Sequence, residues 1–200
     1  MRVTGGKLRG FNLRSPTGPG TRPMSDRLKL TLFNMLVARD QPRGRVLDLY
    51  SGTGALAIES LSRGADAAEL VEQNGSMVGV IRQNLKHTRL ESRARVHKRS
   101  VEGFLAHPPE REEPFDLVLM DPPYADPTIA TILAAVGARG FLAPDGLLVL
   151  GHTSRREFDA SIPPLILETK RCHGDSCISF YELRPPSAEA ADGEPLFTED

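Results

Sequence analysis

One stretch of the chain, residues 45–59 (RVLDLYSGTGALAIE), most constrains how the protein can fold. Its first part, residues 46–50, is largely apolar, which is typical of a strand buried on both faces of a parallel sheet. Gly52 and Gly54 then turn the chain, and good helix formers follow from Ala55. A strand, a glycine turn and a helix in this order place bare backbone and the positive end of a helix beside a ligand. The stretch therefore predicts a ligand-binding βα unit.

The turn alone leaves the ligand open. Gly52, Gly54 and Ala57 fit the dinucleotide pattern G-x-G-x-x-A, with Glu72 at about the distance of a ribose-binding acid. A tight turn without any ligand is another interpretation. Asp48 ahead of the turn gives D-x-x-x-G-x-G, which resembles the first motif of S-adenosylmethionine-dependent methyltransferases. In those enzymes the acid helps to hold the methionine end of the cofactor.

An alternation of strands and helices continues after the turn. Parallel strands are expected at residues 46–50, 67–72, 94–98, 115–120 and 146–150, and the helices between them at 76–87, 101–106 and 128–139. Two last apolar runs, 165–171 and 177–183, predict a closing antiparallel hairpin. The pattern predicts an α/β fold with a seven-stranded, doubly wound (Rossmann-like) sheet, which matches the class I methyltransferase variant.

A second motif, Asp121-Pro122-Pro123-Tyr124, follows the fourth expected strand. Ligands of open parallel sheets bind at the carboxyl ends of the strands where the strand order reverses, so Asp121 should lie beside the glycine turn. The prolines stiffen the loop and leave the Pro122 carbonyl free to accept a hydrogen bond. Tyr124 offers a flat face on which a base can stack. Because the Asp121 carboxylate and the Pro122 carbonyl can each accept one hydrogen, the motif suits a planar exocyclic amine.

D-P-P-Y resembles the [DNS]-P-P-[FYW] motif of methyltransferases that act on adenine N6, guanine N2 or glutamine amide. The segments R-V-T-G-G-K-L-R-G-F-N-L and R-P-M-S-D-R-L-K-L-T-L-F-N resemble the opening of the RsmD family, bacterial guanine-N2 methyltransferases of small-subunit (16S) ribosomal RNA. The resemblance runs from residue 2 to about residue 183. It implies a monomeric cytoplasmic enzyme that uses S-adenosylmethionine to methylate one guanine of ribosomal RNA in a small-subunit particle.

The resemblance also implies roles for individual residues. Asp121, Pro122 and Tyr124 would be catalytic, Glu72 would accept the ribose hydroxyls, and Ser100 and Val101 would border the adenine of the cofactor. The implied cofactor-binding set is Asp48, Ser51, Gly52, Thr53, Gly54, Glu72, Gln73, Ser100 and Val101. We expect no metal site, because the histidines show no ligand spacing and are interpreted as solvated or capping: His87, His97, His107, His152 and His173.

The charge of the chain is unevenly distributed. Residues 1–45 carry ten basic and two acidic side chains, whereas the whole chain has a net charge of −1. A basic end of this kind indicates contact with phosphates, although a merely solvated basic face is the alternative. The residues expected to bind RNA are Arg2, Lys7, Arg9, Arg22 and Arg27.

Three parts of the chain are predicted from these patterns. Residues 1–43 form a basic N-terminal extension outside the core, with short strands at 2–7 and 9–14, a Pro/Gly-rich loop, and a helix capped by Ser25 or Asp26. Residues 44–184 form the methyltransferase domain. The acidic residues 185–200 are expected to be disordered.

The chain departs from the family pattern at two places. Met24, Lys29 and Leu30 stand where the family usually has Thr and then Arg-Glu, and Gly151-His152 stands where it tends to carry an acid. No apolar run approaches the length of a membrane span. Since the start of the chain lacks the apolar core of a signal peptide, we expect no disulfide between the two cysteines, Cys172 and Cys177.

Two other functions remain open at this point. D-P-P-Y also serves adenine-N6 methylation of RNA or DNA, and only the N-terminal pattern favours guanine. A non-catalytic RNA-binding protein of ribosome assembly could use the same fold without turnover, because a fold does not determine a function.

Overall fold

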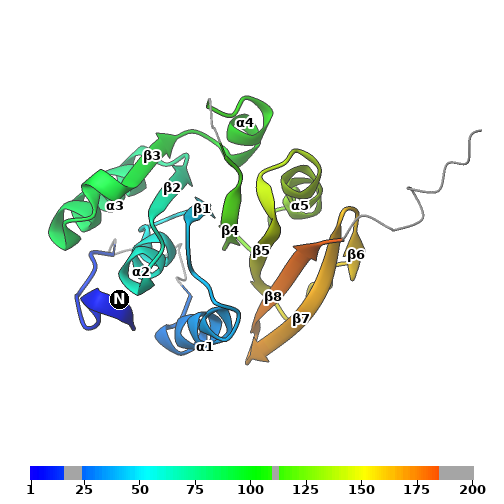
Figure 1. The fold of residues 1–200 in the computed structure, drawn as a ribbon, viewed down its shortest axis with the longest axis horizontal. Coiled ribbons are helices and arrows are strands. Elements are labelled where there is room, and N and C mark those ends of the chain that lie inside the picture. The colour runs from blue at the N-terminus through cyan, green and yellow to red at the C-terminus, as the bar shows by residue number, and fades with distance from the viewer. Residues whose placement is uncertain (16–23, 110–112, 185–200) are drawn as a thin grey trace, which may run out of the picture.

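The computed structural model describes residues 1–15, 24–109 and 113–184, which form one sheet with helices on both faces (Figure 1). The expected Pro/Gly-rich loop and acidic tail lie largely or wholly outside these residues. The sheet has eight strands in the order β3-β2-β1-β4-β5-β8-β7-β6. The first five strands in this order pair parallel to one another, and the pairs β5–β8, β8–β7 and β7–β6 are antiparallel. The strands are β1 (Arg45–Leu49), β2 (Ala67–Glu72), β3 (Ala94–Lys98), β4 (Phe115–Met120), β5 (Leu142–Thr153), β6 (Ser161–Ile162), β7 (Leu165–His173) and β8 (Ser176–Leu183).

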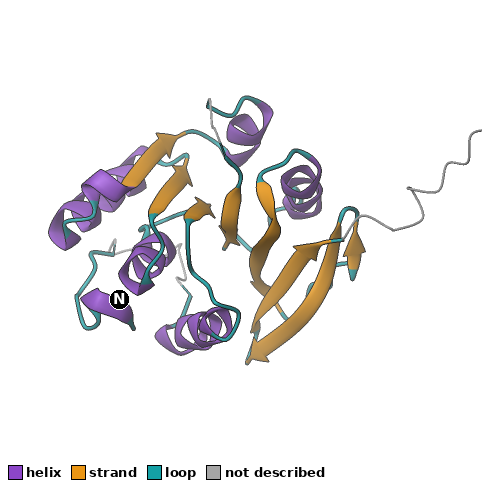
Figure 2. Ribbon diagram, viewed as in Figure 1, coloured by secondary structure: helices purple, strands orange, loops and turns teal. Residues whose placement is uncertain are grey.

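The helices cover the two faces of the sheet in two groups (Figures 1 and 2). On one face lie α1 (Asp26–Val37), α2 (Ala55–Arg63) and α3 (Gly75–Thr88), and on the other α4 (Val101–Ala106) and α5 (Ile129–Ala138). Each group packs its own apolar cluster against the sheet. The doubly wound α/β architecture predicted from the alternating pattern is therefore confirmed. Across the described residues, no helix is long and apolar enough to cross a membrane.

The reversal of strand order lies between β1 and β4. From β1 the chain passes to β2 on one side, and it returns later to β4 on the other side. Leu49 pairs with Met120 at the ends of the two strands. The segments that follow β1 and β4 therefore leave the sheet side by side, which is the crevice in which open α/β sheets bind ligands.

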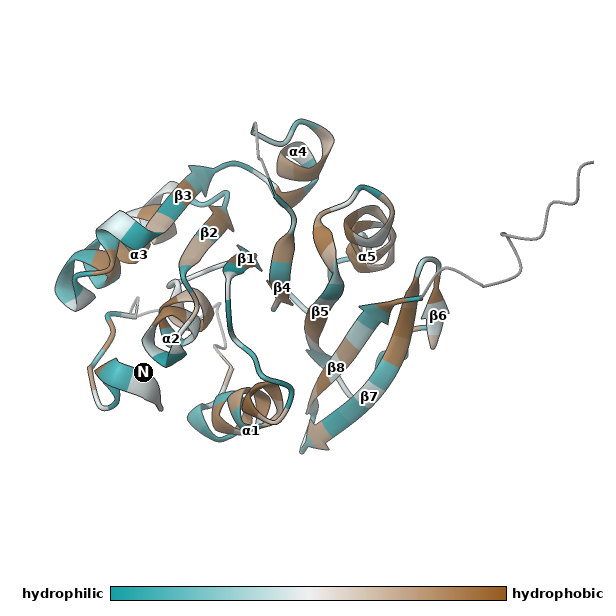
Figure 3. Cartoon of the chain, in the orientation of Figure 1, coloured by the Kyte–Doolittle hydropathy of each residue, from teal (hydrophilic) through white to brown (hydrophobic). Residues whose placement is uncertain are grey.

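The central strands carry many hydrophobic residues, which Figure 3 shows as brown segments of β4 and β5. Val46, Leu47 and Leu49 of β1 are fully buried, as are the last four residues of β4. Burying one such side chain contributes about 1.5–3 kcal/mol, so the two strands that end at the crevice belong to the most firmly held part of the fold.

The expected count of seven strands is wrong by one. The additional strand is the short β6, which pairs antiparallel with β7 at the edge of the sheet. Its two residues, Ser161 and Ile162, are too few to show a period-two pattern in the sequence.

The predicted strands at 2–7 and 9–14 are also wrong, although the two segments do pair antiparallel, with the Val3 N–H donating to the Phe11 carbonyl at 2.9 Å. A single bridge joins Arg2 to Asn12, and residues Gly6–Leu8 form a 3-10 helix, η1. This segment also bonds to α2: the Ser62 hydroxyl donates to the Gly5 carbonyl at 2.7 Å and accepts from the Leu8 N–H at 2.9 Å. A Cβ on Gly6 would lie 2.0 Å from the Ser62 carbonyl oxygen, so the contact requires glycine.

The expectation that the N-terminal segment stands outside the core is contradicted as well. Val3, Leu13 and Phe33 are buried in the same apolar cluster as α2. Lys29, one of the departures from the family pattern, is buried with its Nζ 3.4 Å from the carboxylate of Glu59 and donates to the Arg2 carbonyl. The division of the chain at residue 43 stays a prediction, but the segment before it completes one face of the core.

The two cysteines form a disulfide, contrary to expectation. Cys172 and Cys177 stand directly opposite each other in the β7–β8 register, on either side of the turn at Gly174. The expectation relied on cellular compartment alone, whereas the pairing follows from the register of the hairpin.

The buried carboxylate of Glu59 should be important for stability. Its side chain is fully buried, and its oxygens accept from Arg63 Nε at 2.9 Å and from Thr4 N at 2.7 Å as well as facing Lys29. Removing one partner of a buried pair leaves an uncompensated charge, which costs about 3–5 kcal/mol. We therefore expect Glu59→Ala to lower the free energy of unfolding, measured by urea denaturation, by about that amount.

Arg155→Ala is the matched control, because its pair with Asp175 is 80% and 70% exposed. Exposed pairs contribute only about 0–1 kcal/mol. A similar small loss in both variants would contradict a structural role for the Glu59 cluster.

Candidate active site

The turn after β1 has a tightly folded backbone. Tyr50, Gly52 and Gly54 all have positive φ, at 60°, 55° and 77°. The Ser51 hydroxyl donates to the Asp48 carbonyl at 2.6 Å, and the Gly54 N–H donates to the Ser51 carbonyl at 2.8 Å. A Cβ on Gly54 would come within 3.2 Å of Leu70, so the turn packs closely on β2. This geometry leaves bare backbone at the start of α2.

Asp48 lies beneath the turn and is only 1% exposed. Its Oδ2 accepts a hydrogen bond from the Ala57 N–H of α2 at 3.1 Å. The pKa of this carboxyl is raised to about 8: burial is the main cause, the Ala57 hydrogen bond opposes the rise, and the nearby charges of Asp121 and Glu72 add to it. A positive charge close by would favour the ionised form of this acid. A buried acid of this kind at a strand end marks a candidate functional site.

Glu72 ends β2 and faces the same turn. Its Oε2 accepts from the Gly52 N–H at 2.9 Å and its Oε1 from the Asn74 N–H at 2.8 Å. The structure therefore brings Glu72 to the glycine turn beside Asp48, as expected from the placement of the second strand. Gln73, the next residue, is exposed.

Three other residues of the implied cofactor-binding set have side chains that are bonded elsewhere or buried. Thr53 is buried, and its hydroxyl donates to the Met1 sulfur at 3.4 Å. Ser100 follows β3 at the same edge of the sheet, but its Oγ accepts from the Gly103 N–H and caps α4. The side chain of Val101 is buried in the core, so it would border a ligand only from the side of the core.

Asp121 follows β4 and is half-buried. Desolvation by the surrounding protein raises the pKa of its carboxyl to about 6. A Cβ on Gly151 of β5 would lie 2.4 Å from Asp121 Oδ1. The carboxyl group therefore rests against the bare backbone of β5, whose Leu150 pairs with Met120. This contact explains why glycine occupies position 151.

The loop that continues from Asp121 is held at several points. The Asp126 N–H donates to the Pro123 carbonyl at 2.9 Å, and the Tyr50 hydroxyl donates to Asp126 Oδ2 at 3.0 Å. The Tyr124 hydroxyl lies 3.4 Å from Ser176 Oγ at the β7–β8 turn. Through Tyr50 the Pro-Pro loop is connected directly to the glycine turn, as expected for two motifs of one site.

A buried contact beside the glycine turn that the sequence analysis missed is made by Asn84 of α3. This buried amide donates to the Thr53 carbonyl at 2.9 Å and to the Arg14 carbonyl at 3.1 Å, and its oxygen accepts from the Arg14 N–H at 2.8 Å. It joins the glycine turn to the N-terminal segment. The available signal was an amide on the inner side of an amphipathic helix, where a buried polar group needs partners.

The interpretation of all histidines as solvated or capping is wrong. His152 is 2% exposed, with Nε2 2.9 Å from Ser179 Oγ and Nδ1 2.9 Å from the Thr153 carbonyl oxygen. Burial lowers the pKa of this imidazole, which keeps it neutral. His97 pairs with Glu69 at 2.8 Å. Within residues 1–15, 24–109 and 113–184, no group of three acids, histidines or cysteines is arranged to hold a metal.

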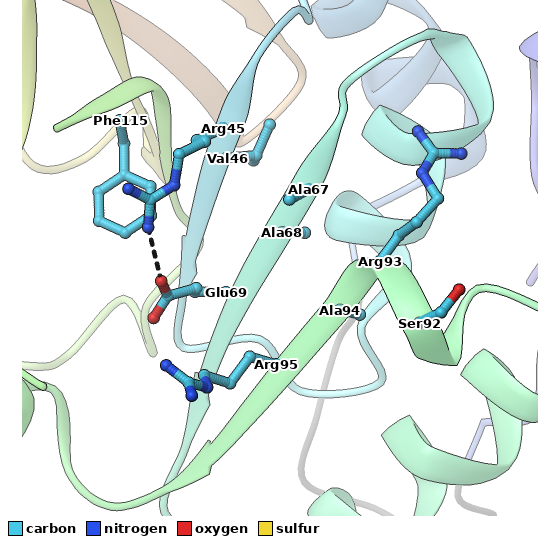
Figure 4. Close-up of a pocket in the computed structure, with 10 residues that line it drawn as sticks. All are labelled: Arg45, Val46, Ala67, Ala68, Glu69, Ser92, Arg93, Ala94, Arg95 and Phe115. Carbon is cyan, nitrogen blue, oxygen red and sulfur yellow. Dashed lines mark hydrogen bonds and ion pairs between the residues drawn. The ribbon is translucent and has the colours of Figure 1, made fainter. Parts of the chain in front are cut away.

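A cavity of about 240 Å³ lies elsewhere, between Arg45, Glu69, Arg95 and Phe115 (Figure 4). Arg45 lies over the ring of Phe115 and donates to Glu69 at 2.9 Å. The cavity sits toward the amino ends of β1 to β3, whereas ligands of such sheets bind at the carboxyl ends. It is therefore separate from the candidate active site.

The order of the strands and the positions of the two motifs are those of the class I methyltransferase fold. The chain belongs to the family described as "Conserved hypothetical protein 95", whose family model matches residues 1–182. It is 31% identical over 184 residues to "Putative rRNA methyltransferase YlbH" of Bacillus subtilis, covering 92% of this chain and 100% of that one. The resemblance to the RsmD family is confirmed by 34% identity over 148 residues to "Ribosomal RNA small subunit methyltransferase D" of Escherichia coli K12, covering 74% and 72% of the two chains.

A solved structure agrees with this assignment. The protein titled "Putative methyltransferase yhhF from Escherichia coli" superposes with a TM-score of 0.79 at 28% identity, over 92% of this chain and 97% of that one. The similarity thus extends across nearly all of the residues that build the sheet and the candidate site.

Gly151 gives a direct test of the site geometry. In Gly151→Ala the new methyl group would displace Asp121, and a displacement of about 1 Å can cost about 10²-fold in rate. We expect methyl transfer to fall by about 10–10²-fold. Gly79→Ala on α3 is the control, because a Cβ there meets nothing within 4 Å. Equal rates in the two variants would show that Asp121 does not depend on the space at Gly151.

Proposed function

We propose that this protein transfers a methyl group from S-adenosylmethionine to the exocyclic N2 amine of a guanine in small-subunit ribosomal RNA. The observation that carries the proposal is the position of Asp121 and Pro122, which leave β4 beside the glycine turn that follows β1. The identity to "Ribosomal RNA small subunit methyltransferase D" supports RNA as the substrate. The division into an RNA-binding segment before residue 44 and a domain that carries the chemistry belongs to the same proposal.

The residues around the turn fit this cofactor chemically. S-adenosylmethionine combines a positively charged sulfur and amino group with a ribose diol, and it supplies an activated methyl group when bound. Asp48 is a buried acid whose ionised form a nearby cation would favour. Glu72 offers a carboxylate to hydroxyl groups, and the glycines allow close approach. Gln73, Ser100 and Val101 lie farther along the same edge, where we place the adenine.

The chain's own groups then orient the amine. The Asp121 carboxylate accepts one amine hydrogen and the Pro122 carbonyl the other, so the nitrogen lone pair points toward the methyl carbon. The N–C bond forms as the S–C bond breaks, and the surplus proton passes to Asp121 or to water. Because the methyl group is already activated, positioning supplies most of the rate enhancement.

The target base has to leave its stack to reach this crevice, as base-modifying enzymes generally require. Tyr124 is half-buried beside the crevice and provides a ring on which the base can stack. Exposed basic side chains at the N-terminal end, Arg2, Lys7, Arg9 and Arg27, would hold RNA phosphates. Arg22, which belongs to the same proposal, lies outside the described residues.

The experiment is methyl incorporation by the purified protein from tritiated S-adenosylmethionine into small-subunit particles and into free 16S RNA, followed by nucleoside analysis. We expect N2-methylguanosine. N6-methyladenosine would favour the adenine alternative, and cofactor binding without incorporation into either RNA would favour the non-catalytic one. Asp121→Ala should lower incorporation by about 10²–10⁴-fold while cofactor affinity stays near that of the wild type.

The pH dependence follows from the pKa of Asp121. The carboxyl accepts the amine hydrogen only when ionised, and its pKa in the free protein is about 6. Below that value kcat/KM for RNA should therefore fall by about tenfold per pH unit, and above it should level off. Asp121→Asn should be slow and lack this limb. A wild-type profile that is flat from pH 5 to 7.5 would argue against an ionised Asp121 in the reaction.

A further inference from the structure

Arg156 is half-buried in the segment that follows β5, and its guanidinium reaches the Pro-Pro loop. Its Nη1 donates to the Asp126 carbonyl at 2.5 Å and lies 3.4 Å from the Tyr124 carbonyl oxygen. Both acceptors belong to the backbone just after Asp121-Pro122-Pro123. A cation on two carbonyls makes stronger hydrogen bonds than a neutral donor would.

The loop has few backbone donors of its own because of its sequence. Pro122 and Pro123 have no N–H, and the turn is closed by one bond, from the Asp126 N–H to the Pro123 carbonyl. On the side of the glycine turn, the Tyr50 hydroxyl holds the side chain of Asp126. On the opposite side, Arg156 holds the backbone of the same residue. The two contacts together restrain the loop from both directions.

The guanidinium itself is held by a rigid support. Its Cζ lies 4.9 Å from the centre of the Phe158 ring, and that ring packs edge-on against His152 with centroids 5.3 Å apart. His152 is buried and fixed to Ser179 of β8. Stacking of a planar cation on an aromatic ring is a property of arginine that lysine does not reproduce.

We propose that Arg156 is a positioning residue, which holds the Tyr124–Asp126 backbone so that the Pro122 carbonyl and the Tyr124 ring face the target amine. This inference rests on the proposed function. Arg155, the neighbour of Arg156 in the sequence, has a different environment: its side chain is 80% exposed and pairs with Asp175. The two adjacent arginines therefore form a natural pair of test and control.

The experiment compares Arg156→Ala, Arg156→Lys and Arg155→Ala with the wild type. We expect kcat for methyl transfer to fall by about 10–10²-fold in Arg156→Ala, with cofactor affinity unchanged. The kcat of Arg156→Lys should lie between those of Arg156→Ala and the wild type. Guanidinium ion added at millimolar concentration should restore part of the activity of Arg156→Ala. Arg155→Ala should keep the wild-type kcat.

A measurement without substrate or cofactor gives the second readout. Amide hydrogen exchange in the peptide covering residues 121–130 should become about tenfold faster in Arg156→Ala and stay unchanged in Arg155→Ala. Unchanged exchange in Arg156→Ala, or a kcat equal to that of Arg155→Ala, would overturn the positioning role. So would a parallel loss of cofactor affinity and thermal stability, because that pattern indicates a general structural role.

The failure of this inference is distinguishable from failure of the proposed function. If the wild type methylates RNA and Asp121→Ala does not, the proposed function stands whatever Arg156→Ala does. If the wild type transfers no methyl group, the proposed function fails, and the exchange measurement still decides whether Arg156 orders the loop.

Discussion

The pairing of β1 with β4 is the contact on which the rest of the molecule depends. It joins strands that are far apart in the sequence, and Leu49 beside Met120 marks the point where both chains leave the sheet. Every acid discussed for the site takes its position from this pairing or from the next strand along. The helices, by contrast, mainly cover the two faces. The crevice is thus a direct product of strand order, and the apolar burial of the central strands keeps it in place.

Three carboxyl groups lie close together in this crevice, which makes their joint ionisation unfavourable in the free protein. Asp48 and Asp121 both have raised pKa values, chiefly through burial, and Glu72 adds its charge nearby. Such an arrangement is unfavourable for three ionised groups and becomes favourable when a cation enters. Backbone N–H groups hold two of these acids in place: Ala57 donates to Asp48, and Gly52 and Asn74 donate to Glu72. A positively charged ligand in this crevice would therefore favour the ionised forms of these acids.

The sequence predicted the features that depend on local pattern. Alternating apolar runs gave the strands, and the glycine turn and Asp121-Pro122-Pro123-Tyr124 were placed at the correct strand ends. It could not predict contacts that depend on distant neighbours. Gly6 against Ser62, Gly151 against Asp121 and the burial of His152 all arise where separate segments meet, and no short window of sequence contains both partners. The expectation for Cys172 and Cys177 was wrong for a different reason. The cellular compartment does not determine the register of a hairpin, and it is this register that brings the two cysteines together.

Asn84 couples the N-terminal segment energetically to the conformation of the glycine turn. One amide bonds the Thr53 carbonyl and both backbone groups of Arg14, and it can do so in only one position. If Arg14 moves away, a buried donor and acceptor lose their partner, at a cost of about 1–3 kcal/mol. The position of Arg14 and the conformation of the glycine turn thus share one free-energy term. By thermodynamic reciprocity, whatever steadies one of them steadies the other to the same extent.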